Sequence, residues 1–228
     1  MDESIYTRTA ELIGNEAQDR LKSARVIVFG VGGVGGYAVE ALARAGVGSI
    51  TVVDSDTVSV SNINRQIIAM HSTVGRPKVE VIKERIKDIN PDIEVIPLKM
   101  FYSEENAETI DLKSYDFVLD CIDSVRSKLY LIEKATAAGT QIISSMGAGN
   151  KLDPTRFKVS DILKTHTDPL AKVIRTELRK RGIHRLLTVW SDEAPRHVGK
   201  RTPASISFVP SAAGLVMASE VVKRIARL

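Results

Sequence analysis

Cysteine is almost absent from this chain of 228 residues, in which Cys121 is alone. A single cysteine excludes an intrachain disulfide and any zinc site built on two or four cysteines, and it suits a reducing compartment. Long apolar runs are also missing. Residues 1–20 are polar and acidic, without the apolar core of a signal peptide. The apolar C-terminal stretch is shorter than the about 20 residues that a membrane span needs. We therefore expect a cytoplasmic protein with no structural zinc and no membrane segment.

No repeat, low-complexity tract or Pro/Gly-rich linker divides the chain. Hydrophobic residues make up 43% and charged residues 26%, as in ordinary globular proteins. We expect a single domain over residues 1–228. Its parts are an N-terminal helical segment (about 1–22), a first half (about 23–150) and a C-terminal third (about 151–228).

Charge is distributed unevenly along the chain. Residues 1–150 contain 16 Lys and Arg against 21 Asp and Glu, whereas residues 151–228 contain 16 against 7. The basic C-terminal third favours an anionic partner, although a well-solvated basic surface would give the same composition.

Short β-branched runs alternate with helical patterns through the first half. Strands are expected over 25–29, 49–53, 93–98, 116–119 and 141–144, and helices over 33–45, 77–89 and 124–138. This order predicts an α/β fold with a doubly wound, Rossmann-like, mostly parallel sheet and helices on both faces. After Gly147 the pattern predicts extra antiparallel strands outside the parallel series (156–161, 186–190 and 205–209) and helices over 171–181 and 211–227.

A glycine-rich loop joins the first predicted strand to the first helix. It contains the G-x-G-x-x-G pattern, with candidate phosphate-binding glycines at Gly30, Gly32, Gly33 and Gly35. Such glycines let the backbone approach a phosphate at a helix N-terminus, and Asp54, 24 residues after Gly30, is placed to bind ribose hydroxyls. A turn required only for packing is the structural alternative. The loop alone does not distinguish NAD from ATP.

The residues that follow favour ATP. The polar stretch from Asp54 to Gln66 contains Arg65, and Lys78 opens the next helix. Cations of this kind can hold a triphosphate and neutralise departing pyrophosphate, whereas a nicotinamide enzyme needs an apolar slot. The fourth strand ends in Asp120-Cys-Ile-Asp123, at the ligand-binding edge of such a sheet. Asp123 is a candidate ligand for the Mg²⁺ that accompanies ATP, or a residue of the helix cap at Ser124.

Four motifs in this order resemble the ThiF and ubiquitin-activating-enzyme superfamily: G-V-G-G-V-G-G, V-V-D-S-D-T-V-S-V-S-N-I-N-R-Q, V-G-R-P-K and L-D-C-I-D. Three further motifs resemble its tRNA threonylcarbamoyladenosine dehydratase branch: I-D-S-V-R-S-K (122–128), M-G-A-G-N-K-L-D-P-T (146–155) and V-S-D-I-L-K-T (159–165). The resemblance covers nearly the whole chain.

This resemblance implies roles for individual residues. Asp54 would bind ribose, while Asn62, Arg65 and Lys78 would hold ribose and phosphates. Asp123 and Ser124 would lie at the magnesium and phosphate end. Asp56 and Gln66 belong to the same motif and are counted with the nucleotide-binding residues. The resemblance also implies a homodimer in which Arg8 completes the partner's site, so the candidate catalytic residues are Arg8, Arg65, Lys78 and Asp123.

The scarcity of cysteine bears on the chemistry. Many relatives transfer an activated acyl group to a cysteine, but a cysteine at the end of a buried strand is usually inert. The dehydratase branch implies instead that ATP activates the substrate carboxylate as an acyl-adenylate. A neighbouring urea atom then closes a ring, and such an intramolecular nucleophile needs no enzyme sulfur.

A tRNA would give the basic third a purpose. Its candidate contacts are Arg175, Arg179, Lys180, Arg181, Arg185, Lys200 and Arg201. The alternatives are an adenylyltransferase for a ubiquitin-like sulfur-carrier protein, a tRNA-binding module without catalysis and a nicotinamide-dependent oxidoreductase. A sulfur-transfer partner is also left open.

Overall fold

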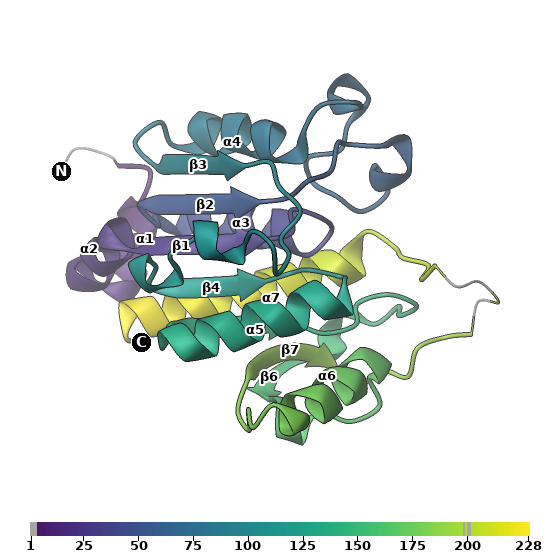
Figure 1. Ribbon diagram of the computed structural model, residues 1–228. Helices are drawn as coiled ribbons and strands as arrows, with labels where there is room; N and C mark the ends of the chain where they lie inside the picture. Colours follow the sequence, from purple (N-terminus) through teal and green to yellow (C-terminus); the bar gives the residue numbers. More distant parts are fainter. Residues whose placement is uncertain (1–3, 198, 200–201) are drawn as a thin grey trace.

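A seven-stranded sheet runs through the centre of the computed structural model, which describes residues 4–197, 199 and 202–228 (Figure 1). The strand order is β3-β2-β1-β4-β5-β7-β6. The strands are β1 (Arg25–Phe29), β2 (Ser49–Val53), β3 (Glu94–Leu98), β4 (Phe117–Asp120), β5 (Gln141–Ser145), β6 (Phe157–Asp161) and β7 (Leu187–Ser191). β6 pairs antiparallel with β7, and the other pairings of this sheet are parallel. The doubly wound, mostly parallel sheet is confirmed. One detail differs, because β7 joins the parallel series beside β5.

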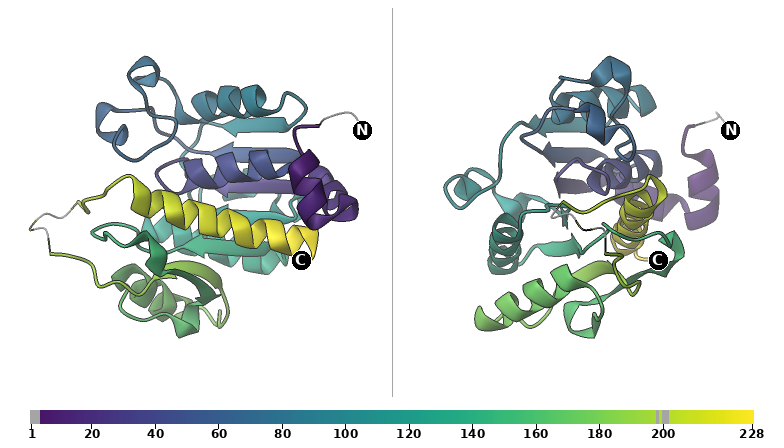
Figure 2. Two further views of the ribbon diagram at one scale, coloured as in Figure 1. Left: turned by 180° about the vertical axis from the view of Figure 1, so that it is seen from behind. Right: turned by 90° about the vertical axis from the view of Figure 1, so that its right-hand side faces the viewer.

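Helices cover both faces of the sheet (Figure 2). The alternation along β1 sends Val26 and Val28 into one apolar cluster and Ile27 and Phe29 into another. The first cluster includes residues of α2 (Asn15–Ser23), α3 (Gly35–Ala45), α4 (Lys78–Ile89) and α7 (Phe208–Ala226). On the other face lie α5 (Val125–Ala138) and α6 (Pro169–Lys180). A further short helix, α1 (Thr7–Ile13), precedes α2.

The strand predicted over 205–209 is wrong. Residues 202–207 form no regular strand, and Phe208 and Val209 belong to the first turn of α7. Pro210 is compatible with this turn because the first N–H groups of a helix have no partner within it. The alternating pattern of Ser, Ile, Ser and Phe looked like a half-buried strand. In the fold, however, Ile206 and Phe208 are exposed while Val209 is buried.

The strand register brings distant loops together at one edge of the sheet. Phe29 pairs with Val53 and with Asp120, and Asp120 pairs with Ser144. The loops after β1, β2, β4 and β5 therefore begin side by side, at the arrowheads of Figure 1. This carboxyl edge is where ligands bind in open α/β sheets. None of the helices in the described residues is long and apolar enough to cross a membrane.

Candidate nucleotide-binding site

The glycine loop packs tightly against the end of β4. Gly30 has a φ of 87°, and a Cβ there would lie 2.7 Å from the carbonyl oxygen of Cys121. A Cβ on Gly35 would overlap the carbonyl oxygen of Gly30. Gly32 is less confined, and a Cβ on Gly33 would lie 3.2 Å from Pro210. Gly30 and Gly35 are thus required by the backbone itself. Gly32 and Gly33 add no side chain to the surface of the loop beside the start of α3.

Asp54 is fixed at this loop through both carboxylate oxygens. Oδ2 accepts a 2.7 Å hydrogen bond from the Val31 N–H, and Oδ1 accepts one of 2.8 Å from the Asp56 N–H. The carboxylate lies at the end of β2, directly beside the loop that follows β1. This is the position predicted for a group that binds a ribose.

Lys78 and Asp56 form an ion pair near the same edge. Lys78 Nζ lies 2.7 Å from Asp56 Oδ2, and its side chain is only 6% exposed against 64% for Asp56. The Lys78 N–H also donates to the Asp56 carbonyl oxygen at 3.0 Å. The ammonium is therefore held in the first turn of α4 by an exposed carboxylate, which an incoming phosphate can replace.

Asn62, Arg65 and Gln66 come from the turn between β2 and α4. The Asn62 side chain is buried and its Oδ1 accepts from the Ser59 N–H at 3.1 Å. Arg65 Nη1 donates to the Ser61 carbonyl oxygen at 2.9 Å, and its Cγ lies 3.5 Å from where a Gly33 Cβ would be. Gln66 is buried with Nε2 facing Gly32, and its Oε1 has no partner among the described residues. The turn thus brings a cation and an unsatisfied amide to the glycine loop.

The two aspartates after β4 have different environments. Asp120 is fully buried, and its Oδ2 lies 2.8 Å from Lys128 Nζ. Asp123 is exposed, and within the described residues its carboxylate has no hydrogen-bond or ion-pair partner. Ser124 is the N-cap of α5 and accepts from the Ser127 N–H at 3.5 Å. Asp123 is thus free to bind a ligand, whereas Asp120 serves the fold.

Lys128 was missed by sequence reasoning as a residue of this edge. Its Nζ also donates to Ser144 Oγ at 3.2 Å and to the Ser145 carbonyl oxygen at 3.1 Å. Lys128 therefore ties the ends of β4 and β5 together beneath the candidate site. In the sequence, a lysine near the start of α5 indicates such a role only when it is considered together with Asp120.

Cys121 is a poor nucleophile in this setting. Its Sγ lies 3.5 Å from Met217 Sδ, and burial raises the pKa of the thiol to about 12. Because the thiolate is the reactive form, the side chain stays an unreactive thiol at neutral pH.

Arg8 lies in α1, at the opposite edge of the sheet from the glycine loop (Figure 1). Tyr6, two residues before Arg8, donates a hydrogen bond from Oη to the carbonyl oxygen of Ala43, in the last turn of α3. The 11 residues of α3 separate this edge from the glycine loop, and a helix of that length spans about 16 Å. The structure thus does not bring Arg8 together with the candidate site of its own chain. A hollow of about 620 Å³, with Arg20 and Asp116 in its lining, also lies at this opposite edge.

The predicted tRNA contacts fall into three groups. Arg175, Lys180 and Arg181 are engaged within the chain, to Thr165 or to Glu177. Arg179 and Arg185 are exposed and have no ion pair with any described residue. Lys200 and Arg201 lie outside the described residues.

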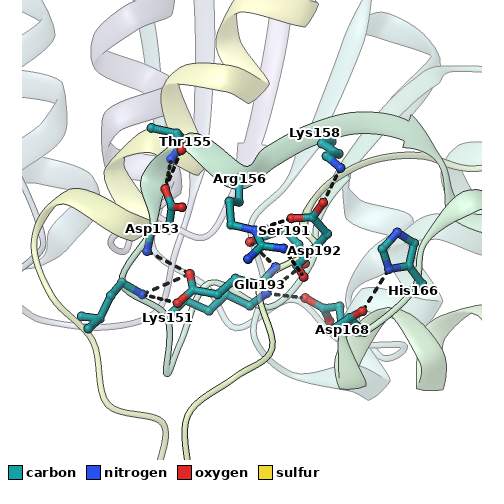
Figure 3. A network of polar contacts seen from close by, with 12 residues as sticks. Lys151, Asp153, Thr155, Arg156, Lys158, His166, Asp168, Ser191, Asp192 and Glu193 are labelled. Atoms are coloured by element: carbon teal, nitrogen blue, oxygen red, sulfur yellow. Dashed lines mark hydrogen bonds and ion pairs between the residues drawn. The ribbon is translucent and has the colours of Figure 1, made fainter.

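A polar network links the end of β5 to α6 (Figure 3). Lys151 Nζ donates to the Gly147 carbonyl oxygen at 2.6 Å and to Asp168 Oδ2 at 2.9 Å, and both charged side chains are buried. Asp168 Oδ1 also caps α6 through the Ala171 N–H at 2.9 Å. The Glu193 carboxylate accepts hydrogen bonds from the N–H groups of residues 152 and 153. The segments after β5 and β7 are therefore fixed to one another.

The described residues contain no group of three or more His, Cys, Asp or Glu side chains arranged to hold a metal ion. The chemistry of Asp123 nevertheless fits Mg²⁺ bound mainly by substrate phosphates. Such a site uses one or two carboxylates, and waters complete it.

Comparison with known proteins gives a consistent result. Residues 6–228 match the ThiF family. The chain is 48% identical over 235 residues to the tRNA threonylcarbamoyladenosine dehydratase of Bacillus subtilis, covering 95% of this chain and 92% of the relative. It is 43% identical to the Escherichia coli protein of that name over 75% of this chain, but spans only 64% of that relative.

Solved structures agree with these relatives. The structure of Escherichia coli tRNA N6-threonylcarbamoyladenosine dehydratase in complex with ATP superimposes with a TM-score of 0.92 at 37% identity, covering 96% of this chain and 93% of the other.

The molybdopterin-synthase adenylyltransferase of Escherichia coli is a more distant relative, 38% identical over 64% of this chain and 58% of its own length. The match over almost the entire chain, together with the glycine loop and the charged edge described above, establishes that this protein belongs to the ThiF family.

Proposed function

We propose that this protein is an ATP-dependent enzyme that dehydrates threonylcarbamoyladenosine in tRNA to its cyclic form. The single observation that carries the proposal is the similarity over nearly the whole chain to dehydratases of that name, one of which binds ATP in its crystal structure. The carboxyl edge of the sheet supports it with a glycine loop, Asp54, Arg65 and Lys78 in one place.

The reaction proceeds in two steps. An oxygen of the threonyl carboxylate attacks the α-phosphorus of ATP, and pyrophosphate leaves. A urea atom of the same nucleoside then attacks the carbonyl carbon and loses its proton, and AMP leaves with the former carboxylate oxygen. The nucleoside loses the elements of one water. Because the nucleophile belongs to the substrate, the reaction needs no cysteine on the enzyme.

The residues of the site supply binding and charge. Asp54 binds ribose, and the glycine-loop amides together with Arg65 and Lys78 bind the phosphates and stabilise the charge that develops on pyrophosphate. Asp123 would hold Mg²⁺, which neutralises phosphate charge when bound. When the phosphates bind, they replace Asp56 as the ion-pair partner of Lys78.

A homodimer with shared sites is part of the proposal. It is supported by the position of Arg8, which is exposed and lies at the edge of its own chain away from the glycine loop. Such an arginine can meet a nucleotide only on another chain. The proposed tRNA contacts lie on the basic third, where Arg179 and Arg185 are among the exposed cations without an ion pair to any described residue. A tRNA substrate is consistent with a cytoplasmic location, which is part of the proposal.

Pyrophosphate release tests the proposal. With ATP and Mg²⁺, release should require tRNA that carries threonylcarbamoyladenosine and should fall at least about a hundredfold in Lys78→Ala, as when one preorganised charge contact is lost. Stimulation by a ubiquitin-like carrier protein instead of tRNA would identify an adenylyltransferase. Arg179→Glu with Arg185→Glu should weaken tRNA binding and leave ATP binding unchanged, whereas equal tRNA affinity would place the RNA elsewhere.

A further inference from the structure

Residues 203–205 and the start of α7 lie against the nucleotide-binding loops. A Cβ on Gly33 would lie 3.2 Å from Pro210 and 3.5 Å from Arg65 Cγ, so the start of α7, the glycine loop and Arg65 converge. A Cβ on Gly149 would lie 2.6 Å from Pro203 Cβ. Residues 203–205 therefore pass between the loop after β5 and the loop that carries Arg65.

A chain of hydrogen bonds runs across this segment from Asn150 to Arg65. The Ala204 N–H donates to Asn150 Oδ1 at 2.7 Å. Asn64 Nδ2 then donates to the Ser205 carbonyl oxygen at 3.1 Å. Finally, Arg65 Nη1 donates to Asn64 Oδ1 at 3.0 Å. Asn150 thus holds residues 204–205, these residues hold Asn64, and Asn64 holds Arg65.

Asn150 is suited to the far end of this chain. It has a φ of 60°, in the left-handed region that asparagine tolerates better than most residues. Its backbone also exchanges hydrogen bonds with the segment: the Asn150 N–H donates to the Ala204 carbonyl oxygen at 2.8 Å, and the Arg196 N–H donates to the Asn150 carbonyl oxygen at 2.7 Å. Asn150 is therefore hydrogen-bonded to both Arg196 and Ala204.

We infer that Asn64 is a positioning residue for Arg65, and that Asn150 acts on Arg65 through residues 204–205 and Asn64. An arginine side chain loses considerable rotamer entropy when it is ordered, so preorganising its guanidinium strengthens the binding of phosphate. Without Asn64, Nη1 keeps one of the two acceptors described, the Ser61 carbonyl oxygen. This inference rests on the proposed function, in which Arg65 binds the phosphates.

Calorimetric titration of the full chain with ATP and with adenosine tests the inference. Asn64→Ala should raise the Kd for ATP about three- to tenfold, the value of one hydrogen bond. Asn150→Gly keeps the left-handed backbone and removes only the side-chain acceptor, so its effect should have the same direction and be smaller. Adenosine affinity should not change in either variant, because adenosine has no phosphate for Arg65.

The double variant separates positioning from independent damage. Because Asn150 acts through Asn64, the variant with both changes should bind ATP as Asn64→Ala does, whereas independent sites would multiply their effects. Thr167→Gly is the matched control for Asn150→Gly, since Thr167 also has a positive φ, 65°. Its ATP affinity should equal that of the unchanged protein.

Arg65→Ala distinguishes failure of the inference from failure of the proposed site. If Arg65→Ala weakens ATP binding while Asn64→Ala does not, the positioning role is refuted and the site stands. If Arg65→Ala has no effect on ATP binding, both are refuted. Multiplicative effects in the double variant, or equal losses of ATP and adenosine affinity, would also refute the positioning role.

Discussion

Replacement of Lys128 by methionine removes one half of a fully buried ion pair. Lys128 and Asp120 are both 0% exposed, and the ammonium donates to Asp120, Ser144 and the Ser145 carbonyl oxygen. Methionine fills a similar volume but leaves the Asp120 carboxylate with two donors among the described residues, Ser144 Oγ and the Ile122 N–H. Breaking a buried pair in this way costs about 3–5 kcal/mol, a large share of the about 5–15 kcal/mol that stabilises a typical protein.

Urea unfolding measures this cost. The fluorescence of Trp190, the one tryptophan in the sequence, reports on a buried position in β7. Lys128→Met should lower the free energy of unfolding by about 3–5 kcal/mol. The double variant Asp120→Asn with Lys128→Met should recover part of the loss, because it removes the charge left unpaired. A loss below about 1 kcal/mol, the size expected of an exposed pair, or additive effects of the two changes would refute the buried pair.

Three further predictions concern single positions. Gly35→Ala should abolish ATP binding in calorimetry, because its Cβ would overlap the Gly30 carbonyl oxygen; retained affinity would contradict the tight loop. Cys121 should resist iodoacetamide at pH 8, since its pKa is raised to about 12, and Cys121→Ala should remain active; rapid labelling or inactivity would contradict this. Hydrogen bonds from Lys158 and Arg156 lower the pKa of Asp192 to about 2. Asp192→Asn should therefore reduce the unfolding free energy at pH 7, and the difference should shrink below about pH 4, where the unfolded carboxyl takes up its proton; a difference independent of pH would contradict the pairing.

The parallel core of the fold was predictable because its signals are local. β-branched runs end at glycines or aspartates, and Gly46 and Gly139 close α3 and α5 in the left-handed conformation. The strand prediction over 205–209 is wrong because the conformation of this segment is set by long-range packing and not by its local alternation. The segment is held by Asn64, which is 141 positions away from Ser205.

The candidate site was predictable to the extent that its chemistry resides in motifs. Asp54 could be named because it follows a strand, Lys78 because it opens a helix, and Arg65 because it is the one arginine of the polar stretch from Asp54 to Gln66. The environments of their neighbours could not be named in advance. Burial separates Asp120 from Asp123, and Glu177 engages Lys180 and Arg181, which composition alone had counted as free cations.

In the proposed reaction, the protein removes the elements of water from a modified nucleoside of tRNA. The most direct measurement is the mass of that nucleoside after incubation of threonylcarbamoyladenosine-bearing tRNA with the purified protein, ATP and Mg²⁺. The nucleoside mass should decrease by the mass of one water molecule, with one AMP and one pyrophosphate formed per nucleoside. An unchanged nucleoside mass under these conditions would contradict the proposed reaction.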